Sequence, residues 1–210
     1  MDIAVDFHGR VHRAMTKRLI NALDEFQLLW IEEPLPPGHE ALLSSLIPSN
    51  ISTPICTGER LSSRWEYRLL FESGVIDVVN PDVSLMGLSE LMKIARMAEA
   101  YDIAVAPHSP QGPVCLAASL QACVASTNAI LLEHSSGIHY NEDYEGLKSG
   151  DLGDYVRDPY AVTPEAGILK NPTNSGLGVV VDEEAVVRAA DDWHLMDAEW
   201  RLPDGRLAEW

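Results

Sequence analysis

Basic residues are scarce in this 210-residue sequence. Fifteen lysines and arginines stand against 32 aspartates and glutamates, for a formal net charge of −17 at pH 7. This excess of acid disfavours nucleic acids and anionic membranes as partners, because their phosphates carry the same sign of charge. An acidic protein that handles an anionic substrate needs a metal ion or local arginines to hold it. The sequence also lacks any run of about 18 apolar residues and any basic-then-apolar leader at Met1, so we expect neither a membrane span nor secretion.

Cysteine and glycine-rich loops are scarce as well. Cys56, Cys115 and Cys123 have no metal-ligand spacing and cannot all pair with one another. We expect reduced thiols in a cytoplasmic protein, with Cys115 and Cys123 packed in a helix. A single glycine, Gly9, follows the first apolar run in "DFHGRVH", which disfavours a Rossmann-type nucleotide site. With 46% hydrophobic residues, the chain can still bury a sizeable core.

Six short apolar runs each stop on an acidic residue or a histidine. The last polar residues of these runs are Asp6, Glu32, Glu59, Asp82, His108 and Glu133. They recur about every 25 residues, which is the length of a strand, a helix and two short loops. Strands that alternate with helices at this spacing indicate consecutive βαβ units and a parallel sheet.

Helical patterns fill the intervals between the runs. Residues 12–26 place apolar side chains three or four positions apart, as one buried face requires: Met15, Leu19, Leu23 and Phe26. The next clear pattern begins with Ser63 and Glu66, spaced as a capping box, and ends at Gly74. Residues 89–102 place apolar side chains on one side of a helix: Leu91, Ile94 or Ala95, and Ala98. These intervals therefore predict the covering helices of an α/β fold.

Two α/β architectures compete, an open doubly wound sheet and a (β/α)8 TIM barrel. Polar residues at six successive strand ends can face one centre only if the strands close into a ring, so we predict a barrel. We expect residues 1–136 to supply about strands 3–8 of an incomplete (β/α)8-type barrel that carries the metal and catalytic residues. We expect residues 137–210 to supply loops, the last barrel helix and a C-terminal return segment that packs back on the barrel.

Three carboxylates stand at consecutive strand ends, those of Asp6, Glu32 and Glu59. Carboxylates that converge without histidine or cysteine suit a hard divalent cation such as Mg²⁺. Glu33 competes with Glu32 as the ligand from the second run. One of the two should point away, because adjacent strand residues face opposite sides of a sheet.

Several segments together resemble a known family. "VDFHGR", "WIEEP", "TGER", "NPD", "APH" and "LLEHS...GIHYN" are similar to the mandelate racemase subgroup of the enolase superfamily, and within it to the D-galactonate dehydratases. The resemblance implies a barrel domain that binds Mg²⁺ through Asp6, Glu32 and Glu59. It also implies a small sugar acid as substrate and a homo-oligomer of full-length chains.

The resemblance further implies roles for the other strand-end residues. His108 resembles the general base for the C2 proton of an aldonate, with Asp82 as its hydrogen-bond partner. His8 resembles the general acid that protonates the departing C3 hydroxyl, and Glu133 the partner of the enediolate oxygen. Two further residues are expected to line the barrel mouth and contact substrate: Arg60 and His139.

The sequence departs from the family in two places. After Asp82 the family typically reads like "PDxSHAGG", whereas this chain reads "PDVSLMGLSE", with Leu85 and Leu88 in place of a histidine and a glycine. The capping domain and two earlier strands of the family do not precede residue 2, so we expect an open arc with little dehydratase activity by itself. A non-catalytic fragment or pseudoenzyme and another dehydratase or racemase of the superfamily stay open. Racemisation is disfavoured because its usual second base, a lysine on the second strand, is not in the chain.

Overall fold

The computed structural model describes residues 1–134, 155–158, 163–191 and 204–205. Within these residues five short parallel strands form one sheet, in the order β1-β2-β3-β4-β5: β1 (Val5–Asp6), β2 (Ile31–Glu32), β3 (Ile55–Thr57), β4 (Val78–Val79) and β5 (Ala104–Val105). Each strand thus pairs with its neighbours in sequence. A doubly wound sheet would reverse its strand order at a switch point, so the observed order is that of a barrel wall.

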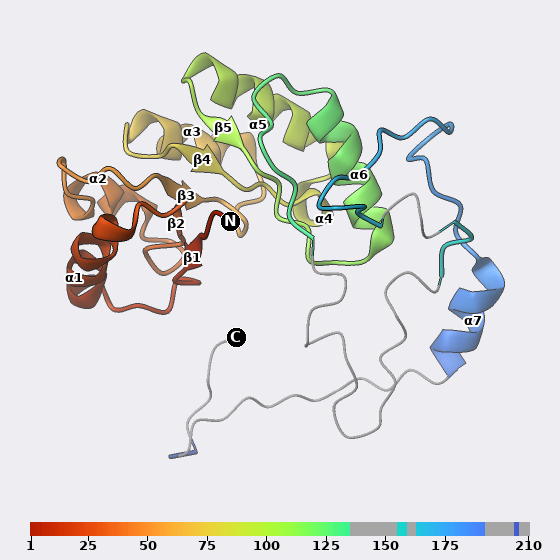
Figure 1. The fold of residues 1–210 in the computed structure, drawn as a ribbon, viewed down its shortest axis with the longest axis horizontal. Helices are drawn as coiled ribbons and strands as arrows, with labels where there is room; N and C mark the ends of the chain where they lie inside the picture. The colour runs from red at the N-terminus through yellow and green to blue at the C-terminus, as the bar shows by residue number, and fades with distance from the viewer. Residues whose placement is uncertain (135–154, 159–162, 192–203, 206–210) are drawn as a thin grey trace.

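Helices follow the strands in regular alternation. Their bounds are α1 (Arg13–Leu23), η1 (Asp24–Phe26), η2 (Glu40–Leu42), α2 (Leu43–Leu46), α3 (Arg64–Glu72), α4 (Val83–Met86), α5 (Leu88–Ala100), α6 (Pro113–Val124) and α7 (Glu183–Asp191). The longer helices from α1 to α5 lie in order along the outer side of the curved row of strands (Figure 1). No helix of the described segments is long and apolar enough to cross a lipid bilayer.

The sixth apolar run, which ends at Glu133, pairs with β5 but is too briefly paired to count as a strand of the sheet. Val105 and Ala129 form an isolated parallel bridge. The Val105 amide donates to the Asn128 carbonyl at 2.9 Å, and the Ile130 amide donates to the Val105 carbonyl at 3.0 Å. The expected order of six runs is therefore kept, while the described sheet has five strands rather than six.

The main core lies between the strands and the helices that cover them. Its largest fully buried side chains include Ile20, Ile31, Ile55, Tyr67, Leu70, Ile94, Val79 and Val105. Full burial of apolar strand residues is expected of a parallel sheet covered by helices. The buried face of α5, predicted by periodicity, is confirmed at Leu91, Ile94, Ala95 and Ala98.

Helix α1 buries the expected face only in part, since Leu19 and Leu23 are partly buried against the main core. Thr16 and Ile20 are its buried residues, while Met15 is 44% exposed and Phe26 is 65% exposed. Thr16 fits the interior because its hydroxyl donates back to the His12 carbonyl at 3.3 Å. Phe26 lies in η1, beyond the end of α1, where the helical period no longer applies.

The start of α3 follows its predicted cap. Ser63 precedes the helix in an extended conformation, and its amide donates to the Glu66 carboxylate at 3.0 Å. This capping box supplies partners for donors that the first helical turn leaves unpaired. Gly74, with φ of +68°, follows the last helical residue closely, as a helix stop requires.

A second described segment packs against α6. Val156 pairs with Val181 in an antiparallel bridge and belongs to a cluster with Leu116 and Ala117 of α6. Cys115 and Cys123 lie partly buried in α6, and all three cysteines are free thiols. Of the segment 137–210, expected to supply loops, the last barrel helix and a return segment, residues 137–154, 159–162, 192–203 and 206–210 lie outside the described residues.

Candidate functional site

Parallel strands bring their carboxyl ends to one edge of the sheet, and those predicted site residues that the structure describes lie at that edge. Asp6 and Glu32 are the last residues of β1 and β2 and are paired in register. Five more candidates lie two or three positions after a strand end: His8, Glu59, Arg60, Asp82 and His108. Glu133 ends the run that bridges to β5. His8 and Glu33 have positive φ angles of 50° and 38°, which non-glycine residues rarely adopt. Such strained backbone is often found at functional sites.

A hydrogen bond joins His108 to Asp82, and we call these two residues the dyad. His108 Nδ1 and Asp82 Oδ2 are 2.8 Å apart, and the Asp82 residue is only 1% exposed. Asp82 also caps α4, because its Oδ1 accepts from the Ser84 amide at 2.7 Å. Burial raises the pKa of Asp82, but hydrogen bonds from His108, Ser84 and Gln111 outweigh it, and the pKa is lowered overall. Asp82 is therefore held as a carboxylate facing the imidazole.

The other nitrogen of His108 faces carboxylates. Nε2 lies 3.6 Å from Glu59 Oε2 and 4.0 Å from Glu133 Oε2. Burial lowers the pKa of His108, but the Asp82 hydrogen bond and the charges of Glu59, Glu133 and Asp82 raise it overall. Desolvation raises the pKa of Glu133, with Asp6 and Asp82 adding to it, against the opposing effects of His108 and the Ser109 amide. The ring thus lies between one fixed acceptor and an acidic cluster.

The three expected metal ligands are held in different ways. Asp6 Oδ1 accepts from the His8 amide at 2.6 Å. Glu32 accepts from the Trp30 indole at 2.9 Å and from the Asn80 side-chain amide at 2.5 Å. Glu59 is 6% exposed and lies 3.6 Å from His8 Nε2.

Electrostatic effects link these carboxylates. Burial raises the pKa of Glu32 to about 7, opposed by the Trp30 hydrogen bond and reinforced by Asp6 and Glu133. Burial also raises the pKa of Glu59 to about 8, and Glu33, Glu32 and Asp6 add to the shift. Each carboxylate makes ionisation of the next less favourable, so the cluster as a whole favours a bound cation.

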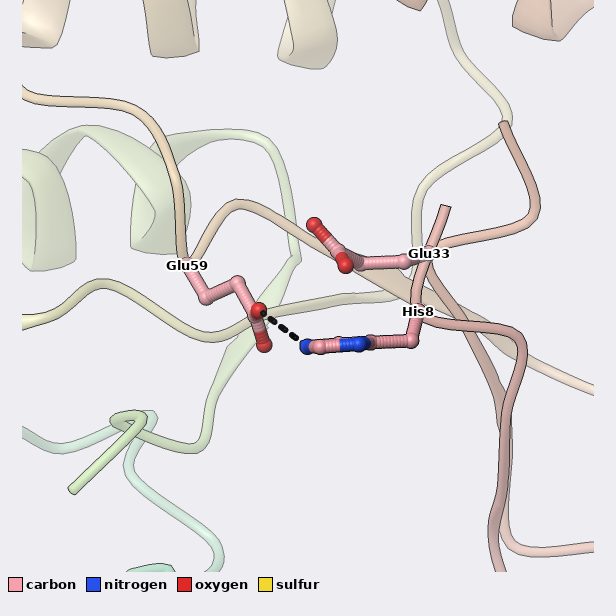
Figure 2. Close-up of side chains that lie close together, drawn as sticks. All are labelled: His8, Glu33 and Glu59. Carbon is pink, nitrogen blue, oxygen red and sulfur yellow. Dashed lines mark ion pairs between the residues drawn. The ribbon is translucent and has the colours of Figure 1, made fainter. Parts of the chain in front are cut away.

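Among the described residues, the group of three side chains that lie close enough together to hold one metal ion differs from the expected set. Single ligand atoms of His8, Glu33 and Glu59 all lie within 4.8 Å of one another. Figure 2 shows these three side chains, with Glu59 and the His8 ring facing each other across their ion pair. Arg60 already binds part of this group, since its Nε donates to both Glu33 oxygens at 2.9 and 3.1 Å. Glu33 is therefore paired with a guanidinium, and Nη2 of the same arginine lies 3.5 Å from Glu59 Oε1.

The chemistry of the donor set fits Mg²⁺. Asp6, Glu32 and Glu59 offer hard carboxylate oxygens, the ligands that Mg²⁺ prefers. Asn80, which donates to Glu32, has a buried Oδ1 with no hydrogen-bond partner among the described residues. A buried carbonyl oxygen without a partner is costly in a site that holds no cation or water. The roles of the three ligands stay predictions.

Several residues at the site were not anticipated from the sequence. Trp30 and Asn80 both hydrogen-bond to Glu32. Ser109 hydrogen-bonds to Glu133, and Gln111 hydrogen-bonds to Asp82. Each lies within three residues of a predicted site residue, and that proximity was the only signal available. Arg60, expected to contact substrate, is bound to Glu33, and His139 lies outside the described residues.

Residues 1–185 match the family model described as enolase C-terminal domain-like. The chain belongs to this family. The structure of this enolase-superfamily chain is similar to that of a mandelate racemase/muconate lactonizing enzyme-like protein from Rubrobacter xylanophilus. The TM-score is 0.77 at 34% identity, over 90% of this chain and 45% of the other. An enolase of the mandelate racemase subgroup from Agrobacterium tumefaciens is similar with a TM-score of 0.72 at 31% identity, over 90% and 48% of the two chains. The predicted α/β barrel-type fold and superfamily are confirmed.

Two curated relatives are similar over the whole of this enolase-superfamily chain. The D-galactonate dehydratase of Ralstonia nicotianae is 42% identical over 214 residues, covering 100% of this chain and 54% of the relative. The D-galactonate dehydratase of Variovorax paradoxus is also 42% identical, with the same coverage. The chain thus spans about half the length of the curated relatives it matches.

Proposed function

We propose that this chain is the catalytic barrel portion of a Mg²⁺-dependent sugar-acid dehydratase, with residues 1–136 carrying the site. The substrate is D-galactonate or a close epimer, and the product is the 2-keto-3-deoxy acid. The identity to two proteins named D-galactonate dehydratase supports this assignment. Within the structure, the supporting observation is His108, with Nδ1 hydrogen-bonded to buried Asp82 and Nε2 facing the acidic cluster.

The arrangement of His108 suits a general base. Asp82 accepts from Nδ1, so the lone pair of the neutral ring is on Nε2 and points toward the site. His108 takes the C2 proton of the substrate, and buried Asp82 stabilises the imidazolium that forms. A neutral, correctly oriented imidazole is the form that can accept this proton.

The remaining step needs an acid and a partner for the developing charge. His8 gives a proton to the C3 hydroxyl, which leaves as water while the electron pair of the former C2–H bond forms the C2–C3 double bond. The resulting enol becomes the 2-keto-3-deoxy acid by tautomerisation. Glu133, whose pKa is raised by desolvation, hydrogen-bonds the enediolate oxygen as the neutral acid.

A divalent cation fits the carboxylates of β1, β2 and the turn after β3. Asp6, Glu32 and Glu59 would hold Mg²⁺, which supplies Lewis-acid stabilisation of the substrate carboxylate and of the enediolate charge. The excess of negative charge that these residues create also explains why an anionic sugar acid requires the cation at all.

One observation favours a second candidate, a family member without turnover. Leu85, which replaces a family histidine next to the dyad, is 54% exposed on α4. An apolar side chain there offers no hydrogen bond to a polyhydroxylated substrate. This candidate predicts Mg²⁺ binding without dehydration.

A chimera tests the proposal. The N-terminal portion of the Ralstonia nicotianae relative that this chain does not match is joined ahead of residue 1. The chimera is incubated with D-galactonate and Mg²⁺ in D₂O, and both product and deuterium at C2 are followed by NMR. We expect turnover at or above about 1 s⁻¹, the low end of ordinary enzymes.

Variants of the chimera separate the roles. His108→Asn should lose both dehydration and C2 exchange, whereas His8→Asn should slow dehydration and keep exchange. His39→Asn, at an exposed histidine, is the matched control. Exchange that survives in His108→Asn would show that the base is assigned wrongly, and Mg²⁺ binding without any turnover would favour the second candidate.

A further inference from the structure

Gln111 contacts the dyad from the segment between β5 and α6. Its Nε2 donates to Asp82 Oδ2 at 2.6 Å. The same oxygen accepts from His108 Nδ1 at 2.8 Å. The carboxylate oxygen that orients the imidazole is therefore shared with a side-chain amide.

The far end of the Gln111 amide is also bound. Its Oε1 accepts from the Cys115 thiol at 3.3 Å, and Cys115 lies in the first turn of α6. Burial raises the pKa of Cys115, so the thiol keeps its proton and acts as a donor. An ionised carboxylate can only accept, and the thiol donates at the other end, so one orientation of the amide satisfies both contacts.

Asp82 depends on protein donors for its hydrogen bonds. The residue is 1% exposed, so water cannot readily replace a lost partner. The Ser84 amide binds Oδ1, while His108 and Gln111 share Oδ2. Ser84 fixes Asp82 Oδ1. Among the described residues, Gln111 is the partner of Oδ2 other than His108.

The segment that carries Gln111 also reaches the other acid beside His108. The Ser109 amide donates to Glu133 Oε2 at 3.2 Å, and the Ser109 residue is 2% exposed. Residues 109–111 thus tie Asp82 and Glu133 to the same short stretch of chain. A shift of this stretch would move both partners of the imidazole.

We propose that Gln111 is a positioning residue, whose amide, oriented by Cys115, holds Asp82 in line with His108 Nδ1. The inference deepens the proposed function and rests on it for the role of His108 as the base. Gln111 touches neither substrate nor cation in this arrangement and acts through Asp82.

The first test uses the 210-residue chain and does not depend on activity. Proton NMR follows the downfield Nδ1–H signal of His108, assigned by its loss in His108→Asn. Gln111→Leu should move this signal upfield and speed its exchange with water. Gln121→Leu is the matched control, since it removes a glutamine amide from α6 that contacts the Gly176 carbonyl instead.

A second pair of variants covers the possibility that Gln111→Leu does not fold. Cys115→Val removes the donor that orients the amide and should shift the signal as Gln111→Leu does, whereas Cys115→Ser keeps a donor and should preserve it. An unchanged signal in Gln111→Leu, or equal effects of Cys115→Val and Cys115→Ser, would overturn the proposal. So would a parent chain with no downfield signal.

The chimera provides the kinetic arm. Gln111→Leu should lower kcat about tenfold with KM changed by less than about twofold, as expected when an outer partner of a functional side chain is lost. An increase in KM alone would contradict a positioning role. An inactive parent chimera would count against the proposed function, while the NMR comparison would still decide the role of Gln111.

Discussion

The contact between Tyr67 and Gly58 supports the turn that carries Glu59, and its loss has a calculable effect. Tyr67 is fully buried in α3, and its hydroxyl donates to the Gly58 carbonyl at 2.6 Å. Gly58 has φ of +139°, and a Cβ built on it would lie 2.8 Å from Tyr67 Cε1. The two residues are therefore fitted to each other in both polarity and shape.

Two substitutions separate polarity from shape. Tyr67→Phe removes the hydroxyl, but the Gly58 carbonyl keeps a second donor, the Leu61 amide at 3.0 Å. The cost should therefore be that of one net hydrogen bond, about 1 kcal/mol. Gly58→Ala overpacks the added methyl group against the Tyr67 ring, at a cost of about 1–3 kcal/mol. It also places a non-glycine residue at an unfavourable φ angle, at a cost of similar size. We therefore expect the unfolding free energy to fall by about 3 kcal/mol in total.

Urea denaturation followed by circular dichroism measures both values, with an unchanged m-value as the sign that only the folded state is affected. For a chain of this size, 1 kcal/mol corresponds to a decrease in Tm of about 2–4 °C. Tyr101→Phe is the matched control. It changes a tyrosine that is 46% exposed, and the expected effect is within about 0.5 kcal/mol.

Two outcomes would contradict these values. A loss above about 2.5 kcal/mol for Tyr67→Phe would mean that the Gly58 carbonyl is left without a partner, against the observed Leu61 contact. A Gly58→Ala chain as stable as Tyr67→Phe would show that the ring moves aside at no cost and that the glycine is not required there.

Three further outcomes are expected. Ser63→Ala should lower the unfolding free energy by about 1 kcal/mol in urea, because it removes the cap of α3; an unchanged midpoint would show that Glu66 alone satisfies the helix start. Asp24 has a pKa lowered by hydrogen bonds from Thr53, so its stabilising effect is present above the ordinary value of 3.8 and is lost as pH falls through the lowered pKa. The stability gap between the parent chain and Asp24→Asn should therefore shrink between pH 6 and pH 3 in urea titrations, and a constant gap would contradict this linkage. Glu59→Gln should abolish Mg²⁺ binding in calorimetry while the chain stays folded; retained binding would exclude Glu59 as a ligand.

The dyad shows how far the sequence leads at the site. The apolar runs before Asp82 and His108 predict neighbouring parallel strands that end at one edge, and the family resemblance implies the hydrogen bond between the two residues. The 2.8 Å contact agrees with that expectation. Gln111 could not be assigned in the same way, because its amide reaches Asp82 through a loop whose course no periodicity describes.

The second strand end shows where local patterns stop applying. The alternation rule predicts that Glu32 and Glu33 face opposite ways, and it assumes extended backbone. Glu33 instead has φ of +38° and pairs with Arg60, which the sequence placed against substrate. The positive φ angle of Glu33 departs from the extended backbone that the rule assumes, and the sequence "EEP" gives no signal for it.

The sequence by itself determined the parallel α/β order, the capping box of α3, the buried face of α5 and the set of polar residues at the strand ends. These features depend on periodicity and on neighbours within a few positions, which the order of residues states directly. Only the tertiary structure decided which carboxylates meet and which pKa values rise. It also decided that Thr16 and Ile20, rather than Met15 and Phe26, are buried, and how briefly the run before Glu133 pairs with β5. Those outcomes depend on distances between segments about 25 residues apart and on local φ angles, which are set when the strands and helices pack together.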